Sequence, residues 1–225
     1  MRAALQFLTI LPVPAPHVPP GAAAVWFPLV GALIGLAAAA AWHTPLGATA
    51  AIVVAVVLTG GLHEDGLADV CDAVRAGRSR ERMLEILKDS RIGAYGAIAI
   101  VLSILVRWQA MSRMEGGVWW KFVLAHAAAR SSMVLLAATT QAAAPGLGDA
   151  FRASLPRYAA PLAALQTLGI LIFIPREWPT LLAVAVTVPA VRLWLMRRLG
   201  GFTGDCLGFQ CQIAEAAAWV VLAWR

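Results

Sequence analysis

Three aspartates at helical spacing are the first residues in this chain whose types and positions could do chemistry. Asp65, Asp69 and Asp72 occupy positions i, i+4 and i+7. If the apolar helix that precedes them continues through this segment, their carboxylates share one face of it. Like charges at this spacing repel one another, and a bound cation would relieve the repulsion. Because every ligand would be an oxygen atom, we expect Mg²⁺ or Mn²⁺, with phosphate oxygens completing the coordination. A solvated acidic helix end is the alternative interpretation.

Basic residues follow these aspartates directly. The segment 60–96 holds more than half of the chain's twelve acidic residues, and its cations are Arg75, Arg78, Arg80, Arg82, Lys88 and Arg91. Within it, SRERMLEILKDSR mixes charged and apolar residues, a pattern typical of a helix lying on a membrane surface. The closing DSRIGAYG combines an acid, a hydroxyl and an arginine with two glycines, a composition suited to holding phosphate. Together with the aspartates, it indicates a phosphoryl-transfer centre.

The composition excludes an ordinary soluble domain. Hydrophobic residues make up 60% of the 225 residues and charged residues 13%, and the mean hydropathy is +0.76. Soluble domains carry about a quarter charged residues. The net charge of +6 indicates loops that face anionic lipid and not a nucleic-acid partner. No polar linker divides the apolar runs, so we expect one integral membrane domain over residues 1–225.

Apolar runs of about 20 residues, the length that crosses a bilayer as a helix, recur along the chain. We therefore expect an all-α, polytopic integral membrane helical bundle with about seven transmembrane helices. The expected spans are 23–42, 48–62, 94–111, 119–140, 159–174, 180–196 and a last segment that ends near Trp224.

The distribution of lysine and arginine predicts the orientation of this bundle. With seven spans, one side carries eleven basic residues and the other carries four. The side with eleven should face the cytoplasm, and it includes both the 65–91 segment and a second acidic motif, GGFTGD, which ends at Asp205. Two acidic motifs on one face can form one active site.

Four motifs, in this order along the chain, resemble the cobalamin synthase family, the adenosylcobinamide-GDP ribazoletransferases. They are ALQFLTILPVP near the amino terminus, GGLHEDGLADVCDA, RMLEILKDSRIGAYG, and GGFTGDCLGFQCQIAE near the carboxyl terminus. The resemblance implies a Mg²⁺-dependent enzyme of the bacterial cytoplasmic (inner) membrane, with its active site facing the cytoplasm. It would join adenosylcobinamide-GDP to α-ribazole or α-ribazole 5′-phosphate, release GMP, and complete the nucleotide loop of vitamin B12. Other cobalamin-assembly enzymes are possible partners.

Roles follow for individual residues. We predict Asp65, Asp69 and Asp72 as catalytic metal ligands, with Asp205 completing the set. His63 would accept the ribose hydroxyl proton, or it would only hydrogen-bond backbone at a helix end. Glu215, an isolated acid in an apolar run, would be a substrate ligand or a buried polar contact. The full predicted substrate-binding set is Arg78, Arg80, Arg82, Lys88, Asp89, Ser90, Arg91, Gly93, Gly96, Gly204, Asp205 and Glu215.

Two other classes compete with this interpretation. CDP-alcohol phosphotransferases also use Mg²⁺ and aspartates, but their signature would need different residues at Leu62, Asp69 and Val70. A transporter would use acids and arginines within the membrane as an ion path. His126, Arg130 and Arg192 lie inside expected spans and keep that possibility open, whereas the acids cluster at one face.

Overall fold

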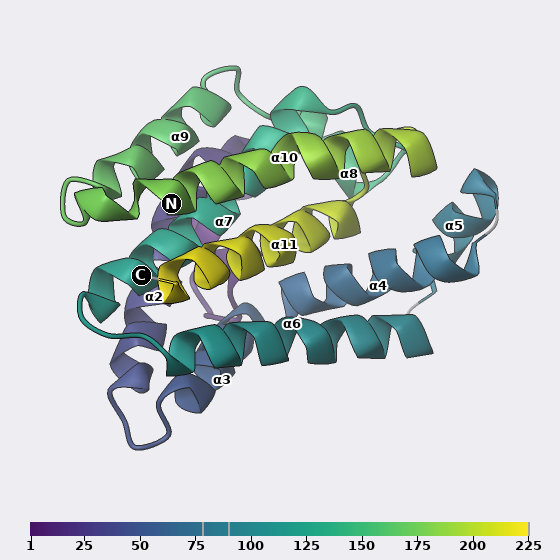
Figure 1. Ribbon diagram of the computed structural model, residues 1–225. Coiled ribbons are helices and arrows are strands. Elements are labelled where there is room, and N and C mark those ends of the chain that lie inside the picture. The colour runs from purple at the N-terminus through teal and green to yellow at the C-terminus, as the bar shows by residue number, and fades with distance from the viewer. Residues whose placement is uncertain (78, 90, 225) are drawn as a thin grey trace.

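The computed structural model describes residues 1–77, 79–89 and 91–224, and the regular elements in these ranges are helices (Figure 1). In chain order they are α1 (Arg2–Leu8), the 3-10 helix η1 (Pro20–Trp26), α2 (Phe27–Trp42), α3 (Ala48–Thr59), α4 (Leu62–Ala76), α5 (Arg80–Ile86), α6 (Ala94–Ser112), α7 (Val118–Thr139), α8 (Leu147–Ala153), α9 (Ala159–Ile170), the 3-10 helix η2 (Pro175–Glu177), α10 (Trp178–Arg198) and α11 (Gly204–Ala223). The predicted all-α class is confirmed.

Five of the helical segments in the described ranges are long and apolar enough to cross a membrane. They are η1 with α2, α6, α7, η2 with α10, and α11. Helix α9 is apolar but has only 12 residues. The chain is therefore a multi-pass membrane protein, as its composition predicts.

The helix expected over 48–62 ends early. It stops at Thr59, and both Gly60 and Gly61 adopt positive φ angles, of 62° and 72°, which residues with side chains rarely tolerate. The axes of α3 and α4 consequently meet at 85°. The preceding apolar helix does not continue into the acidic segment. The aspartates belong instead to a separate helix, α4, whose direction α3 does not set.

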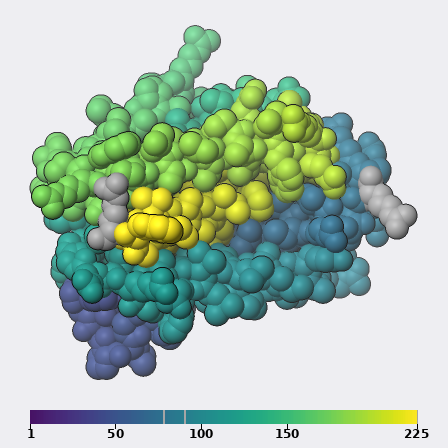
Figure 2. Space-filling view, viewed as in Figure 1, coloured from purple at the N-terminus to yellow at the C-terminus, as the bar shows by residue number. Residues whose placement is uncertain are grey.

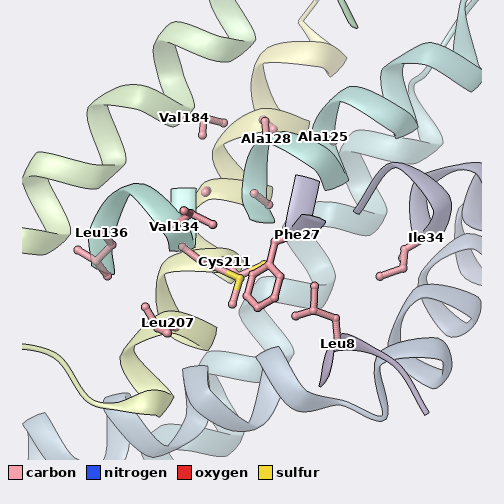
Figure 3. Packing of buried hydrophobic residues seen from close by; sticks show 14 of the residues in the cluster. Leu8, Phe27, Ile34, Ala125, Ala128, Val134, Leu136, Val184, Leu207 and Cys211 are labelled. Atoms are coloured by element: carbon pink, nitrogen blue, oxygen red, sulfur yellow. The ribbon is translucent and has the colours of Figure 1, made fainter. Parts of the chain in front are cut away.

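Helix α7 lies at the centre of the bundle. Within its apolar window, 83% of the residues are buried, more than in any other candidate span of the described chain. Helices α2, α9, α10 and α11 pack around it. Figure 3 shows Phe27 of α2 between Leu8 of α1 and Cys211 of α11, and the Phe27 ring centroid is 5.8 Å from that of Phe151.

The helices that carry the charged segment lie beside α11. Helix α4 packs against both α11 and α6, and in the space-filling view α11 forms a band between α10 and α6 (Figure 2). The carboxyl ends of α4 and α10 point the same way as the amino ends of α6 and α11 (Figure 1). The loop before α11 is fixed by a parallel bridge between Ala142 and Phe202. This arrangement brings the two acidic motifs to one region of the molecule.

Candidate active site

Helix α4 is amphipathic, and this property decides which of its acids reach solvent. Its buried face includes His63, Glu64 and Asp72, whereas Asp65 is exposed and Asp69 is partly exposed. Glu64 and Asp65 lie in the first turn, where the helix dipole favours negative charge. Asp65 and Asp69, one turn apart, are therefore the two α4 carboxylates that a ligand can reach.

Asp72 has a different environment from the other two aspartates. Its carboxylate accepts hydrogen bonds from the backbone nitrogens of Gly93, at 2.7 Å, and Gly96, at 2.9 Å. These amides lie at the start of α6, where N–H groups have no partner inside the helix. A Cβ added to Gly93 would come within 2.5 Å of Asp72 Oδ1. The two glycines predicted to approach phosphate thus make room for the Asp72 carboxylate, which joins α4 to α6.

Asp205 reaches α4 because two helices cross at glycines. In α4, a Cβ added to Gly66 would lie 2.6 Å from the backbone oxygen of Asp205, and a Cβ added to Gly208 of α11 would lie 3.3 Å from the Gly66 Cα. The Asp205 side chain is oriented by Thr203, whose hydroxyl donates to Oδ2 at 3.1 Å. As a result, Asp69 lies within electrostatic range of the carboxylates of Asp65, Asp72 and Asp205.

These carboxylates do not form a ready-made metal cage. In the part of the chain that the structure describes, no group of three or more acidic, histidine or cysteine side chains is arranged to hold a metal ion by itself. The donor set nevertheless suits Mg²⁺, which commonly takes only one or two carboxylates and completes its shell with water and substrate phosphates. Asp65, Asp69 and Asp205 carry oxygen ligands of this kind and lie within electrostatic range of one another.

The predicted phosphate-binding arginines fall into two groups. Arg80 is held by backbone: its Nε donates to the carbonyl of Leu199 at 2.7 Å and its Nη2 donates to the carbonyl of Ala143 at 2.6 Å. It therefore ties α5 to the loops that precede α8 and α11. The backbone of Gly204 lies at the start of α11, where a Cβ would be 3.0 Å from Leu147.

Arg82 and Arg91 form ion pairs on the surface. Arg82 bonds to Glu85 at 2.8 Å, and Arg91 bonds to Asp89 at 2.6 Å. Hydrogen bonds from Arg91 lower the pKa of Asp89 to about 2. Exposed pairs of this kind contribute little stability because solvent screens them, so a phosphate can replace the carboxylate partner.

Three predicted substrate-binding residues remain, of which the structure describes one. Lys88 is exposed near the end of this segment. Arg78 and Ser90 lie outside the described residues.

His63 and Glu215 are more deeply buried than Asp65 and Asp69. Glu215 is 1% exposed, and its oxygens bond to Arg107 Nη1 at 3.1 Å and to Arg130 Nη1 at 2.6 Å. Of the two interpretations left open for it, the structure favours the buried polar contact. His63 is also 1% exposed, and neither ring nitrogen has a hydrogen-bond partner. The backbone hydrogen bond considered for His63 is not formed by its side chain.

The partner that Glu64 and Glu215 share, Arg107, was not predicted from the sequence. Arg107, in the second half of α6, is 1% exposed and bonds to both Glu215 and Glu64. A lone arginine within an apolar span is a signal that could have identified it. Arg130 and His126, in contrast, were singled out, and both lie in this buried cluster.

Comparison with known proteins agrees with the motifs. The model of the cobalamin-5-phosphate synthase family matches residues 1–223. An adenosylcobinamide-GDP ribazoletransferase of Ectopseudomonas mendocina is 41% identical, over 99% of this chain and 97% of its own length. Proteins with the same name from Ralstonia pickettii and Herpetosiphon aurantiacus are each 38% identical, over 98% of this chain and 94% of their own lengths. No solved structure matches. With a match over nearly its whole length, this chain belongs to the cobalamin-5-phosphate synthase family.

Proposed function

We propose that this protein is an adenosylcobinamide-GDP ribazoletransferase. It would transfer the adenosylcobinamide phosphate moiety of adenosylcobinamide-GDP to α-ribazole or α-ribazole 5′-phosphate, with GMP as the leaving group. The relatives that match over almost their full length carry the name of this activity. The observation in the structure that supports it best is the α4–α11 crossing, which joins Asp65 and Asp69 to Asp205 within a membrane helix bundle.

We propose Asp65, Asp69 and Asp205 as the residues that hold Mg²⁺. Their oxygens match the preference of this ion, and their mutual repulsion would be relieved by a divalent cation. When bound, the ion would neutralise charge on the diphosphate and on the departing phosphate. Asp72 is assigned to the surrounding structure, since both of its oxygens already accept backbone hydrogen bonds.

The chain's own cations would orient the diphosphate. Arg82 and Arg91 are exposed and their carboxylate partners are exchangeable, so we assign them to the phosphates. Arginine binds phosphate with two parallel hydrogen bonds and thereby fixes its direction. Arg80, with its donors on two backbone carbonyls, would hold α5 in place.

The acceptor hydroxyl must lose a proton as it attacks the phosphorus. His63 remains our proposal for this base, since it lies on α4 two residues before Asp65 and a neutral imidazole can accept a proton. Neither of its ring nitrogens has a protein hydrogen-bond partner, but both are buried, so this role requires the acceptor hydroxyl to enter the bundle. The protein would lie in the bacterial inner membrane, and the distribution of basic residues predicts that the side with the 65–91 segment and Asp205 faces the cytoplasm.

Labelled substrate tests the proposal directly. Purified protein in detergent, given guanosine-labelled adenosylcobinamide-GDP, α-ribazole and Mg²⁺, should release labelled GMP in step with cobalamin formation. EDTA should stop the release reversibly. Asp65→Asn and Asp69→Asn should each abolish most turnover. Release of GDP would refute attack at the cobinamide-proximal phosphate, and a transporter would release no nucleotide.

A further inference from the structure

Glu64 lies at one end of a polar network buried between four helices. Its Oε1 accepts a hydrogen bond from Arg107 Nη2 of α6 and another from Gln212 Nε2 of α11, both at 3.1 Å. The Gln212 oxygen in turn accepts from Ser103 of α6 at 3.0 Å. Through Arg107 the network continues to Glu215 in α11. Glu64 is thus the point at which this network holds α4.

The network is buried, and its two glutamates and two arginines carry equal and opposite charge. Glu64 and Glu215 supply two negative charges, while Arg107 and Arg130 supply two positive charges. The side chains of Arg107 and Glu215 are each 2% exposed and that of Glu64 is 9% exposed. Apolar residues of similar volume often stabilise a protein as well as such a buried ion pair does. What the ion pairs add is direction, because the guanidinium group bonds only in its own plane.

Direction matters for α4 because its start is not fixed by the preceding helix. Gly60 and Gly61 separate α3 from α4 with positive φ angles and an 85° bend. A helix that follows such a bend can rotate about its own axis unless side chains prevent it. The residue after Glu64 is Asp65, about 100° further round the helix, and Asp69 follows one turn later. Any rotation of α4 would therefore change where both carboxylates face.

We propose that Glu64 is a positioning residue. Held by Arg107 and Gln212, it fixes the rotation of α4 at its first turn, as Asp72 does nearer its end, and so aims Asp65 and Asp69 toward Asp205. This inference rests on the proposed role of those carboxylates in the reaction. Glu64 itself faces the bundle interior and has no part in the chemistry.

Gln212→Met tests the inference without leaving a buried charge unpaired. The substitution removes one of the two donors to Glu64 and keeps the side chain's length. Gln210→Met is the matched control, since Gln210 is buried in the same helix but donates to Thr187 of α10, at 2.8 Å. Cys71 provides a native reporter of rotation: it lies on α4 and is partly exposed, whereas Cys206 and Cys211 are buried.

Two measurements are made on each variant in detergent: the rate at which a maleimide labels Cys71 without substrates, and the kcat and KM for adenosylcobinamide-GDP. For Gln212→Met we expect a changed labelling rate and a kcat that falls about tenfold, with an unchanged KM. Gln210→Met should match the wild type in both measurements. Glu64→Gln keeps an oxygen that can accept both hydrogen bonds but removes the charge that balances Arg107, so it should lose less turnover than Glu64→Leu, which loses the hydrogen bonds as well.

The outcomes separate the inference from the function on which it rests. Wild-type labelling and kcat in both Gln212→Met and a folded Glu64→Leu would overturn the positioning role. If Glu64→Leu does not fold, Gln212→Met decides alone. A changed labelling rate with an unchanged kcat would support the control of rotation by Glu64 and overturn the proposed role of the carboxylates.

Discussion

Gly66 provides a sharp test of the proposed site, because the α4–α11 crossing leaves no room for a side chain there. In Gly66→Ala the new Cβ would lie 2.6 Å from the backbone oxygen of Asp205, where ordinary contacts begin at 3.4 Å. The two helices must therefore separate by about 0.8 Å, and overpacking of this kind typically costs about 1–3 kcal/mol. The separation would occur at Gly66, where the close approach of the two helices brings Asp205 to the α4 carboxylates.

A displacement of about 1 Å in a catalytic site can reduce the rate about 100-fold. We expect Gly66→Ala to lower turnover by about 10- to 100-fold, measured as labelled GMP release. Gly208→Ala, on the other side of the crossing, meets its nearest atoms at 3.3 Å and should lose much less activity. Gly169→Ala in α9 has no neighbour within 4 Å and serves as the control. Its turnover should equal that of the wild type.

Turnover should therefore be highest in Gly169→Ala, lower in Gly208→Ala and lowest in Gly66→Ala. Folding is checked separately by thermal unfolding in detergent, since a loss of activity caused by unfolding would not report on the crossing. If folded Gly66→Ala protein turned over as fast as Gly169→Ala, the close approach of α4 and α11 would not be needed for the reaction. The assignment of Asp205 to the same site as Asp69 would then fail.

Asp72→Asn weakens the hydrogen bonds that join α4 to α6, so it should reduce the free energy of unfolding by about 1–3 kcal/mol and lower the thermal unfolding midpoint. Asp65→Asn should lower turnover and leave the midpoint unchanged. Arg80→Ala should destabilise the protein in the same assay, while Arg82→Ala should leave stability unchanged and raise the KM for adenosylcobinamide-GDP; equal midpoints would refute the structural role of Arg80. Topology reporters fused after Arg80 and after Gly204 should both report the cytoplasm, and opposite sides would exclude a shared site.

Much of the fold could be predicted from the sequence because a bilayer imposes a length on each apolar helix. The runs that became α6 and α7 contain no proline, and these helices follow the expected spans 94–111 and 119–140 closely. The break after α3 was missed, although two adjacent glycines are a recognised turn signal. Hydropathy alone does not distinguish a helix that continues from one that turns, since both sides of the break are helical.

The candidate site was predictable where it depends on local spacing. The positions of Asp65 and Asp69 on one helix follow from their separation of four residues. Asp72 shares that spacing, but its partners are amides of α6, and such a contact depends on how two helices pack. The same limit applies to Glu64, whose partner Arg107 is 43 residues away. Tertiary contacts of this kind leave no periodic pattern in a single sequence.

The structure divides the charges near α4 into fixed and exchangeable ones. Glu64, Arg107 and Glu215 are desolvated, so breaking their pairs would leave a bare charge in an apolar interior. Arg82 and Arg91 lie in water, where their carboxylate partners cost little to replace. A phosphate group that arrives at this end can therefore recruit the second set without disturbing the first. Because Glu64 and Asp65 are neighbours on one helix, the buried pairs can hold the geometry of a site whose surface charges remain free to bind substrate.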